Sequence, residues 1–265
     1  MSITIAELQR KMDAGEKITM ITTYDATFAR LVEAAGVDMI LIGDSLGNVM
    51  QGCDNTLSVT VDDMIYHGRC VMRGCSTPFV VADMPFGSYQ ASDEEGVRNG
   101  IRILKESGVH AVKIEGGLRC VPLIKRLVQA GVPVMGHIGL TPQSVNTMSG
   151  YHVQGKAQED AENLCKDALA LQEAGVFSIV IECVPRQLGE RIQKSLHIPV
   201  IGIGAGPDTA GQVLVIQDAL GMGMGKKSKF VRQFATLAET ITDALKTYVN
   251  CVKDGSFPSD QESYH

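Results

Sequence analysis

The stretch Ala111-Val-Lys-Ile-Glu-Gly-Gly117 predicts a short buried strand that runs out into a pair of glycines. Side chains alternate along a strand, so Val112 and Ile114 point one way while Lys113 and Glu115 point the other. An ammonium and a carboxylate directed together into a protein interior are costly unless something there uses them. This stretch alone leaves two interpretations open, a structural ion pair and part of a functional site.

A repeated phrase connects this strand with the rest of the chain. It occurs four times, as Glu33-Ala-Ala-Gly-Val37, Lys105-Glu-Ser-Gly-Val109, Val128-Gln-Ala-Gly-Val132 and Gln172-Glu-Ala-Gly-Val176. Each copy predicts a helix end, a glycine in the left-handed conformation, and a β-branched residue that starts a strand. Repeated units of this kind with nearly continuous apolar strands are typical of a parallel sheet covered by helices.

The length favours one particular arrangement of these units. About eight of them fit into 265 residues, which predicts an α/β fold of the (β/α)8 TIM-barrel class, as a single domain over residues 1–265. An N-terminal helix is expected over Ile5–Ala14 and C-terminal helices over Phe230–Val252. An open doubly wound sheet is the alternative, because the eighth strand is weakly marked. The expected strands are Ile18–Thr23, Asp38–Ile42, Phe79–Ala82, the Lys113/Glu115 strand, Val132–Gly136, Phe177–Ile181, Pro199–Ile203 and Val213–Ile216.

Composition and charge argue against several classes of protein. The net charge of −6 argues against nucleic-acid binding, and the short basic patch Lys226-Lys-Ser-Lys229 predicts a solvated loop. Seven cysteines without a Cys-x-x-Cys pair favour reduced thiols over a disulfide framework. No apolar run approaches the roughly 20 residues that cross a bilayer, and the first residues lack the apolar core of a signal peptide. We therefore expect an acidic cytoplasmic protein.

Polar residues stand at the ends of most of the expected strands, where (β/α)8 barrels carry their chemistry. Five carboxylates at one mouth would repel one another, and a bound divalent cation would resolve this. An all-oxygen set such as Asp44, Asp83 and Glu115 suits Mg2+ or Mn2+ better than zinc. The alternative is that these acids cap the helices that follow. The residues in question are Asp25, Asp44, Asp83, Glu115, His137 and Glu182, with Lys113 one inward step lower.

Two further side chains have more than one possible role. His137 is either a catalyst or a histidine with satisfied hydrogen bonds. Lys113 is either a Schiff-base lysine or a fixed charge, and beside a metal site a charge partner for an anionic substrate is the more economical role. The glycine-rich Gly202–Gly206 lacks the spacing of a dinucleotide-binding loop and predicts a turn. Such a mouth would bind Mg2+ and a small anionic ligand beside a carboxylate base, which equips it for enolisation next to a carbonyl.

The sequence also resembles the ketopantoate hydroxymethyltransferase family over nearly its whole length. The segments that carry the resemblance follow the family's order and are, together, highly specific. They are Thr22-Thr-Tyr-Asp25, Gly43-Asp-Ser-Leu-Gly47, Thr56-Leu-Ser-Val-Thr60, Ala82-Asp-Met-Pro-Phe86, Val112-Lys-Ile-Glu-Gly116, Gly136-His-Ile-Gly-Leu-Thr-Pro-Gln143, Gly150-Tyr-His-Val-Gln-Gly155, Ile181-Glu-Cys-Val-Pro185 and Ile201-Gly-Ile-Gly-Ala-Gly206.

The resemblance implies a Mg2+-dependent barrel enzyme of pantothenate biosynthesis. Such enzymes transfer a hydroxymethyl group from 5,10-methylenetetrahydrofolate to 3-methyl-2-oxobutanoate and assemble as homo-oligomers, often decamers. It implies that Glu182 is the proton acceptor. Our own hypothesis for the mechanism adds that Lys113 and His137 help to hold the developing enolate. The resemblance also implies a metal site at Asp44, Asp83 and Glu115, and ketoacid contacts from Asp44, Ser45, Asp83 and Lys113.

Three positions depart from the family pattern: Ser58, His152 and Ser228, all in expected loops. They put loop packing or folate contacts in doubt rather than the metal site. Two rival readings are a carbon–carbon lyase or mutase of the isocitrate lyase group and a non-catalytic barrel that only binds. The Lys-Lys-Cys-Gly-His loop of those lyases is not found in this sequence. The grouping of Lys113, Glu115, His137 and Glu182 argues against the non-catalytic barrel.

Overall fold

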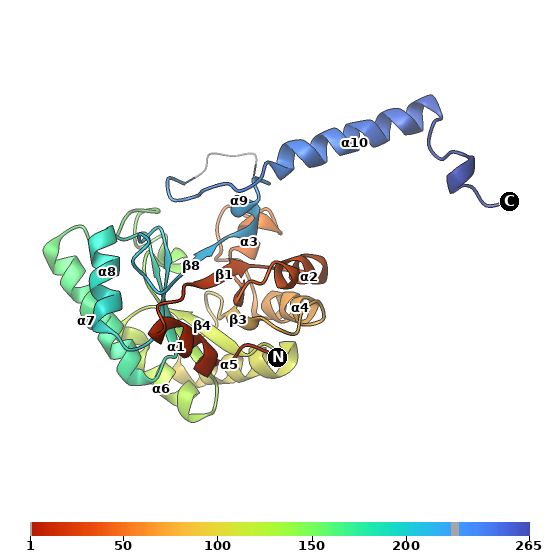
Figure 1. The fold of residues 1–265 in the computed structure, drawn as a ribbon. Coiled ribbons are helices and arrows are strands. Elements are labelled where there is room, and N and C mark those ends of the chain that lie inside the picture. Colours follow the sequence, from red (N-terminus) through yellow and green to blue (C-terminus); the bar gives the residue numbers. More distant parts are fainter. Residues whose placement is uncertain (1, 224–227) are drawn as a thin grey trace. The chain divides into compact units, whose positions relative to one another are not determined.

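The computed structural model describes residues 2–223 and 228–265, which form two compact units, Met1–Val215 and Ile216–His265. In the first unit the described residues form eight parallel strands that close into a barrel in the order β1 to β8 (Figure 1). The predicted (β/α)8 class is therefore confirmed, and the open sheet is excluded because β1 pairs with β8. The strands are β1 Ile18–Thr22, β2 Met39–Ile42, β3 Phe79–Asp83, β4 Ala111–Glu115, β5 Val134–Gly139, β6 Ser178–Glu182, β7 Val200–Ile203 and β8 Gly211–Leu214.

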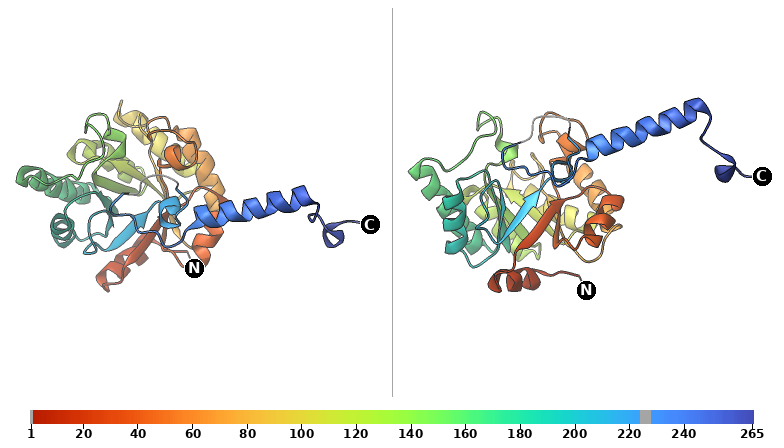
Figure 2. Two further views of the ribbon diagram at one scale, coloured as in Figure 1. Left: turned by 90° about the horizontal axis from the view of Figure 1, so that it is seen from above. Right: turned by 45° about the horizontal axis from the view of Figure 1, so that its top comes forward.

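Helices surround this barrel on the outside, as the view from above shows (Figure 2). Thr4 and Thr60 begin α1 and α4 with capping boxes, and Ser92 caps α5 by accepting from the Glu95 amide. The helices of this unit are α1 Ile5–Asp13, α2 Ala26–Ala34, α3 Leu46–Val49, α4 Val61–Met72, α5 Asp93–Ser107, α6 Val121–Gln129, α7 Gln158–Ala174 and α8 Arg186–Ser195, with the short 3-10 helices η1 Leu118–Cys120 and η2 Pro142–Ser144.

The four glycines of the repeated phrase all have the left-handed conformation. Their φ angles are 76° at Gly36, 82° at Gly108, 83° at Gly131 and 97° at Gly175. Each glycine lets the chain leave a helix and enter the next strand without the steric cost that a β-carbon would add. The repeat thus marks four of the helix-to-strand connections of the barrel.

The interior of the barrel is layered, and the layers follow from strand alternation. The lower layers are apolar: Phe79 and Val81, Ala111, Met135 and Val180 belong to one buried cluster, which Leu8 of α1 joins. Two residues further along the same strands, the same inward face carries polar groups. The barrel is therefore an apolar core in its lower part and a polar mouth at the carboxyl ends of its strands.

Two strand predictions need correction. The fifth strand was expected to end at Gly136, but β5 continues through Gly139, so His137 lies within the strand and not after it. The eighth was expected over Val213–Ile216, but β8 starts at Gly211, and Ile216 begins α9. Gly211 carries no strand signal, yet a β-carbon there would lie 2.4 Å from the Ile18 carbonyl oxygen, so barrel closure requires glycine.

The second unit contains α9 Ile216–Ala219, α10 Leu237–Asp254 and η3 Asp260–Glu262. The helix expected over Phe230–Val252 begins only at Leu237, so that prediction is wrong for its first seven residues. None of the side chains of α10 is buried within the chain, and its large exposed apolar residues recur at helical spacing: Ile241, Leu245, Tyr248, Val249 and Val252. Within the described residues no helix is long and apolar enough to cross a membrane. Part of the basic patch Lys226-Lys-Ser-Lys229 lies outside the described residues.

Candidate active site

The polar mouth of the barrel brings together the residues predicted from the strand ends. Asp83, Lys113, Glu115 and His137 come from β3, β4 and β5, and all four are almost completely buried. Glu182 ends β6, with 15% of its side chain exposed. Asp44 is buried just after β2, at the beginning of the loop that leads into α3. The register of the parallel strands places these groups at two successive inward positions, since Asp83 pairs with Lys113, and Glu115, two residues further along β4, pairs with His137.

Lys113 is the centre of this cluster. Its Nζ lies 3.0 Å from Asp83 Oδ1 and donates to His137 Nδ1 at 2.9 Å, while Glu115 Oε1 is 3.9 Å away. An ammonium has three hydrogens to donate, and of the two short contacts only the one with His137 is a hydrogen bond, so at least one hydrogen remains for a ligand. Lys113 therefore neutralises part of the carboxylate charge and retains a donor for an anionic oxygen.

The imidazole of His137 connects Lys113 with Glu182. Its Nδ1 is 3.4 Å from Glu115 Oε1, and its Nε2 is 3.3 Å from Glu182 Oε2. Burial and the charge of Lys113 lower the pKa of His137, but the Glu115 and Glu182 carboxylates outweigh them and raise it to about 9. While Lys113 is charged, its 2.9 Å contact needs a lone pair on Nδ1. Adding a second proton to the ring would therefore break the contact with Lys113.

The three predicted metal ligands differ in their electrostatics. Burial, together with Asp83 and Glu115, raises the pKa of Asp44 well above its usual value. Burial also raises the pKa of Asp83, against the charge of Lys113. For Glu115, burial is outweighed by the neighbouring His137 and Lys113 and by the hydrogen bond from the Gln143 amide, and the pKa is lowered. The buried carboxyls of Asp44 and Asp83 thus resist ionisation because too little positive charge lies near them.

The donor set fits a hard divalent cation. Asp83 Oδ1 is buried without a hydrogen bond, its contact with Lys113 being an ion pair only, and the hydrogen bond that Asp44 accepts from Gln143 goes to its Oδ2. Among the residues that the structure describes, no group of three or more His, Cys, Asp or Glu side chains is arranged as a complete set of metal ligands. Carboxylate oxygens are nonetheless the ligands that Mg2+ and Mn2+ prefer, and a cation would supply the charge that Asp44 and Asp83 lack.

One predicted mouth residue does not belong to the site. The side chain of Asp25 accepts hydrogen bonds from the backbone amides of Thr27 and Phe28 and so caps α2. For this residue the capping alternative is correct. Ser45 is half-buried at the rim, where its Oγ lies 2.8 Å from the hydroxyl of buried Tyr24.

Sequence reasoning missed two buried polar residues of the site, Gln143 and Tyr89. Gln143 Nε2 donates to Asp44 Oδ2 at 2.8 Å, and the Tyr89 hydroxyl accepts from the Glu115 amide at 3.2 Å. Gln143 stands at the end of one of the segments that carry the family resemblance. Both residues lie in the connections that follow strand ends. The hydrophobic patterns that reveal strands and helices, with periods of 2 and 3.6 residues, do not apply there.

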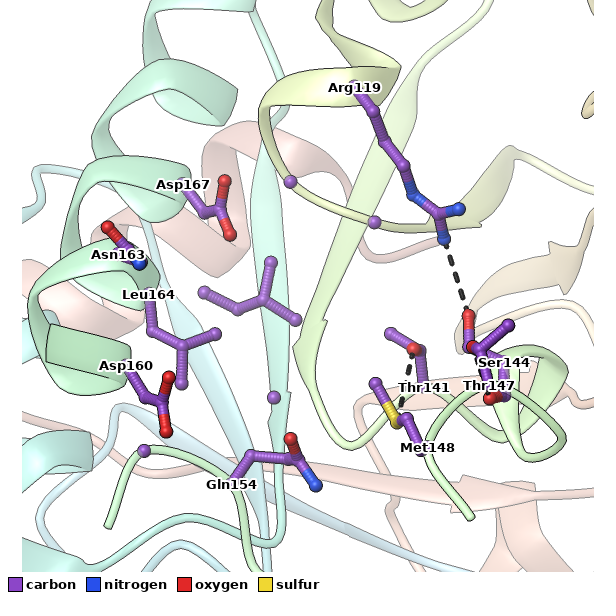
Figure 3. Close-up of a pocket in the computed structure, with 15 residues that line it drawn as sticks. Arg119, Thr141, Ser144, Thr147, Met148, Gln154, Asp160, Asn163, Leu164 and Asp167 are labelled. Carbon is purple, nitrogen blue, oxygen red and sulfur yellow. Dashed lines mark hydrogen bonds between the residues drawn. The ribbon is translucent and has the colours of Figure 1, made fainter. Parts of the chain in front are cut away.

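A cavity of about 370 Å3 lies beside the mouth (Figure 3). Gly116 and Gly139, at the ends of β4 and β5, form part of its wall, and Arg119 points across it toward Ser144. Polar side chains of α7 form the opposite wall: Asp160, Asn163 and Asp167. The predicted catalytic, substrate and metal residues do not line this cavity; they lie in the mouth next to it.

Comparison with known proteins identifies the family. The family model described as ketopantoate hydroxymethyltransferase matches residues 2–260. The chain belongs to this family. Curated 3-methyl-2-oxobutanoate hydroxymethyltransferases from Anaeromyxobacter sp. (strain Fw109-5) and Heliobacterium modesticaldum are each 52% identical to it. The alignments cover 99% of this chain and 88% and 95% of those proteins. The predicted family is confirmed, and the chain is a hydroxymethyltransferase that acts on 3-methyl-2-oxobutanoate in the first step of pantothenate biosynthesis.

Solved structures show how widely the family's barrel is shared. A phosphonopyruvate hydrolase matches with a TM-score of 0.62 at 14% identity, covering 98% of this chain and 93% of its own. A 2,3-dimethylmalate lyase, described as a PEP mutase/isocitrate lyase superfamily member, matches with a TM-score of 0.60 at 18% identity, covering 100% and 92%. At such identities the likeness concerns the fold alone, and the family match decides the activity.

Proposed function

We propose that the barrel mouth binds 3-methyl-2-oxobutanoate together with Mg2+ and that Glu182 removes the proton from its C3 carbon. The observation that carries the proposal is the place of Glu182. Its carboxylate is partly open to the mouth, on the same inner face as Lys113 and 3.3 Å from His137 Nε2. A general base must be able to reach the proton that it removes.

The other residues divide the remaining tasks. Asp44, Asp83 and Glu115 would hold Mg2+, which, when bound, polarises the keto group of a chelated substrate and increases the acidity of its C3–H bond. The free hydrogen of Lys113 and the imidazole of His137 face the negative charge that develops on the keto oxygen. Ser45 offers a hydroxyl at the rim for the ketoacid carboxylate, beside Asp44 and Asp83.

The carbanion that results needs an electrophilic carbon. We propose 5,10-methylenetetrahydrofolate as the donor, as the family's activity implies. Water cleaves both C–N bonds of the donor's N–CH2–N bridge and leaves one hydrogen on each nitrogen, so that tetrahydrofolate departs and the one-carbon unit is released at the oxidation level of formaldehyde. The substrate's C3 attacks this carbon, and its oxygen, which came from water, becomes the alkoxide that takes up a proton to give the hydroxyl of the product. Glu182 returns its proton during this second half of the reaction, so the carboxylate is regenerated.

The test is hydrogen–deuterium exchange at C3 of 3-methyl-2-oxobutanoate in D2O, followed by proton NMR with and without Mg2+. Exchange isolates the first half-reaction, because it needs no folate. We expect Mg2+-dependent exchange that falls by about 10²–10⁴-fold in Glu182→Gln, the usual contribution of a positioned base. Glu190→Gln is the matched control, since Glu190 lies on α8 and pairs with Lys194. Full exchange by Glu182→Gln would refute the role of Glu182 as the base.

We also propose a homo-oligomer, decameric as the family resemblance implies, in the cytoplasm. The exposed apolar residues of α10 support self-association, because an apolar helix face of this length is normally covered. The seven cysteines support a reducing compartment, since all are free thiols. Light scattering after size-exclusion chromatography measures the mass of the assembly directly.

A further inference from the structure

Gln143 contacts the barrel mouth through both its side chain and its backbone, although the proposed reaction assigns it no task. It lies in η2, on the loop after β5, and is 5% exposed. Its side-chain Nε2 donates to Asp44 Oδ2 at 2.8 Å and to the Met84 carbonyl at 3.0 Å. Its backbone amide donates to Glu115 Oε2 at 3.0 Å. A single residue thus contacts two of the three proposed metal ligands.

The orientation of its side-chain amide is determined by its neighbours. Oε1 accepts from Gln90 Nε2 at 3.1 Å and lies 2.8 Å from the Tyr89 hydroxyl, while both hydrogens of Nε2 have acceptors. Rotating the amide by 180° would place its oxygen against the Asp44 carboxylate and the Met84 carbonyl. Such a buried arrangement leaves donors and acceptors unmatched, so only one orientation is stable.

These contacts decide which carboxylate oxygens remain available. Oδ2 of Asp44 and Oε2 of Glu115 are occupied by Gln143, which leaves the other oxygen of each carboxylate, and Glu115 Oε1 faces His137. A neutral amide suits this task better than a lysine or arginine. It orients the carboxylate of Asp44 without supplying the positive charge that a cation would have to displace.

We propose that Gln143 is a positioning residue, which holds Asp44 and Glu115 in the orientation in which they bind a divalent cation and the ketoacid. The inference rests on the proposed metal site. It assigns to Gln143 the part that partners of metal ligands play in proteins generally, where losing such a partner typically costs 10–100-fold in metal affinity or activity.

The experiment compares Mn2+ binding to the whole protein, measured by electron paramagnetic resonance without substrate, with C3 exchange. Gln143→Met keeps the length of the side chain and removes every hydrogen bond that the side chain makes. We expect its Mn2+ Kd to rise 10–100-fold, and the Mg2+ concentration that half-saturates C3 exchange to rise by a similar factor. Ser144→Ala is the control within the same turn, and Gln158→Met makes the same chemical change on exposed α7; both should bind Mn2+ like the unmodified protein.

A second variant keeps the test decisive if Gln143→Met does not fold. Gln90→Leu leaves Gln143 in place and removes one of the two donors that orient its amide, the Tyr89 hydroxyl being the other, so we expect a smaller rise of about 3- to 10-fold in the Mn2+ Kd. A purely structural role predicts a lower melting temperature with unchanged Mn2+ affinity of the folded protein, and that result in every variant that folds overturns the proposal. Failure of the proposed function would look different: Glu182→Gln would retain C3 exchange whatever the metal affinity of the Gln143 variants.

Discussion

Lys113→Met provides the sharpest test of the electrostatics of the mouth. The methionine side chain fills similar space, so the main change is the loss of one buried positive charge among the carboxylates. Lys113 Nζ is 3.0 Å from Asp83 Oδ1, and both side chains are at most 4% exposed. Asp83, Glu115 and Asp44 raise the pKa of Lys113 despite its burial, so the ammonium contributes fully at pH 8.

The expected cost follows from this geometry. Two charges 3.0 Å apart attract by about 5.5 kcal/mol at an effective dielectric constant near 20. Removing one partner of a buried ion pair typically costs about 3–5 kcal/mol, and we expect this loss in the free energy of unfolding at pH 8 without divalent cations. Removing Lys113 raises the pKa of Asp83 further. The penalty is therefore full above that pKa and shrinks as the pH falls through it, so we expect a smaller loss at pH 5 than at pH 8.

The assay is urea denaturation at one protein concentration, at pH 8 and pH 5, in EDTA and in Mg2+. Lys11→Met is the matched control, because Lys11 Nζ lies at the same 3.0 Å from Asp38 Oδ1 but its side chain is 31% exposed. Only the lysine of this pair is exposed, but Asp38 keeps its hydrogen bonds from the amide and hydroxyl of Thr19 and the ammonium of Lys11 is solvated, so we expect a smaller loss than for Lys113→Met. Mg2+ should restore part of the stability of Lys113→Met. Equal losses for the two variants at pH 8, or a loss that grows toward pH 5, would refute the reasoning.

Three further predictions follow from the same structure. Asp44→Asn should stabilise the cation-free protein at pH 8 by about 1–3 kcal/mol in urea denaturation, because it removes a buried charge beside Asp83. The same variant should lose the stabilisation by Mg2+. A variant less stable than the original protein would contradict this prediction. Gly139→Ala should lower the rate of C3 exchange at least 10-fold and the free energy of unfolding by about 2 kcal/mol. The reason is that φ is 89° at this position and a β-carbon would lie 2.3 Å from the Glu182 carbonyl oxygen, so the backbone next to Glu182 has to move. A normal exchange rate would contradict this prediction. Leu245→Glu on α10 should lower the mass measured by light scattering, and an unchanged assembly would exclude this helix face from the interface.

Strand alternation and the repeated helix ends were enough to predict the class of fold and the inward direction of Lys113 and Glu115. These signals are local. In any parallel barrel, a glycine after a helix indicates the end of that helix, and a polar residue two positions after an inward apolar residue indicates a polar group on the same inward face. Sequence alone could not separate Asp25 from Asp44, because an acid after a strand either caps the next helix or turns into the mouth. Which of the two occurs depends on the path of the following loop.

The sequence by itself determined the barrel, the strand ends that carry its polar groups, and the family. Only the tertiary structure decided which of those groups meet and at what distance. Gln143 reaches Asp44 from 99 residues away in the chain, along a loop without periodicity, and Lys113 contacts Asp83 because β3 and β4 pair in that register. Patterns of period 2 or 3.6 describe how one element faces its neighbours. The contacts of the mouth arise from closing eight strands into a ring, which no single segment specifies.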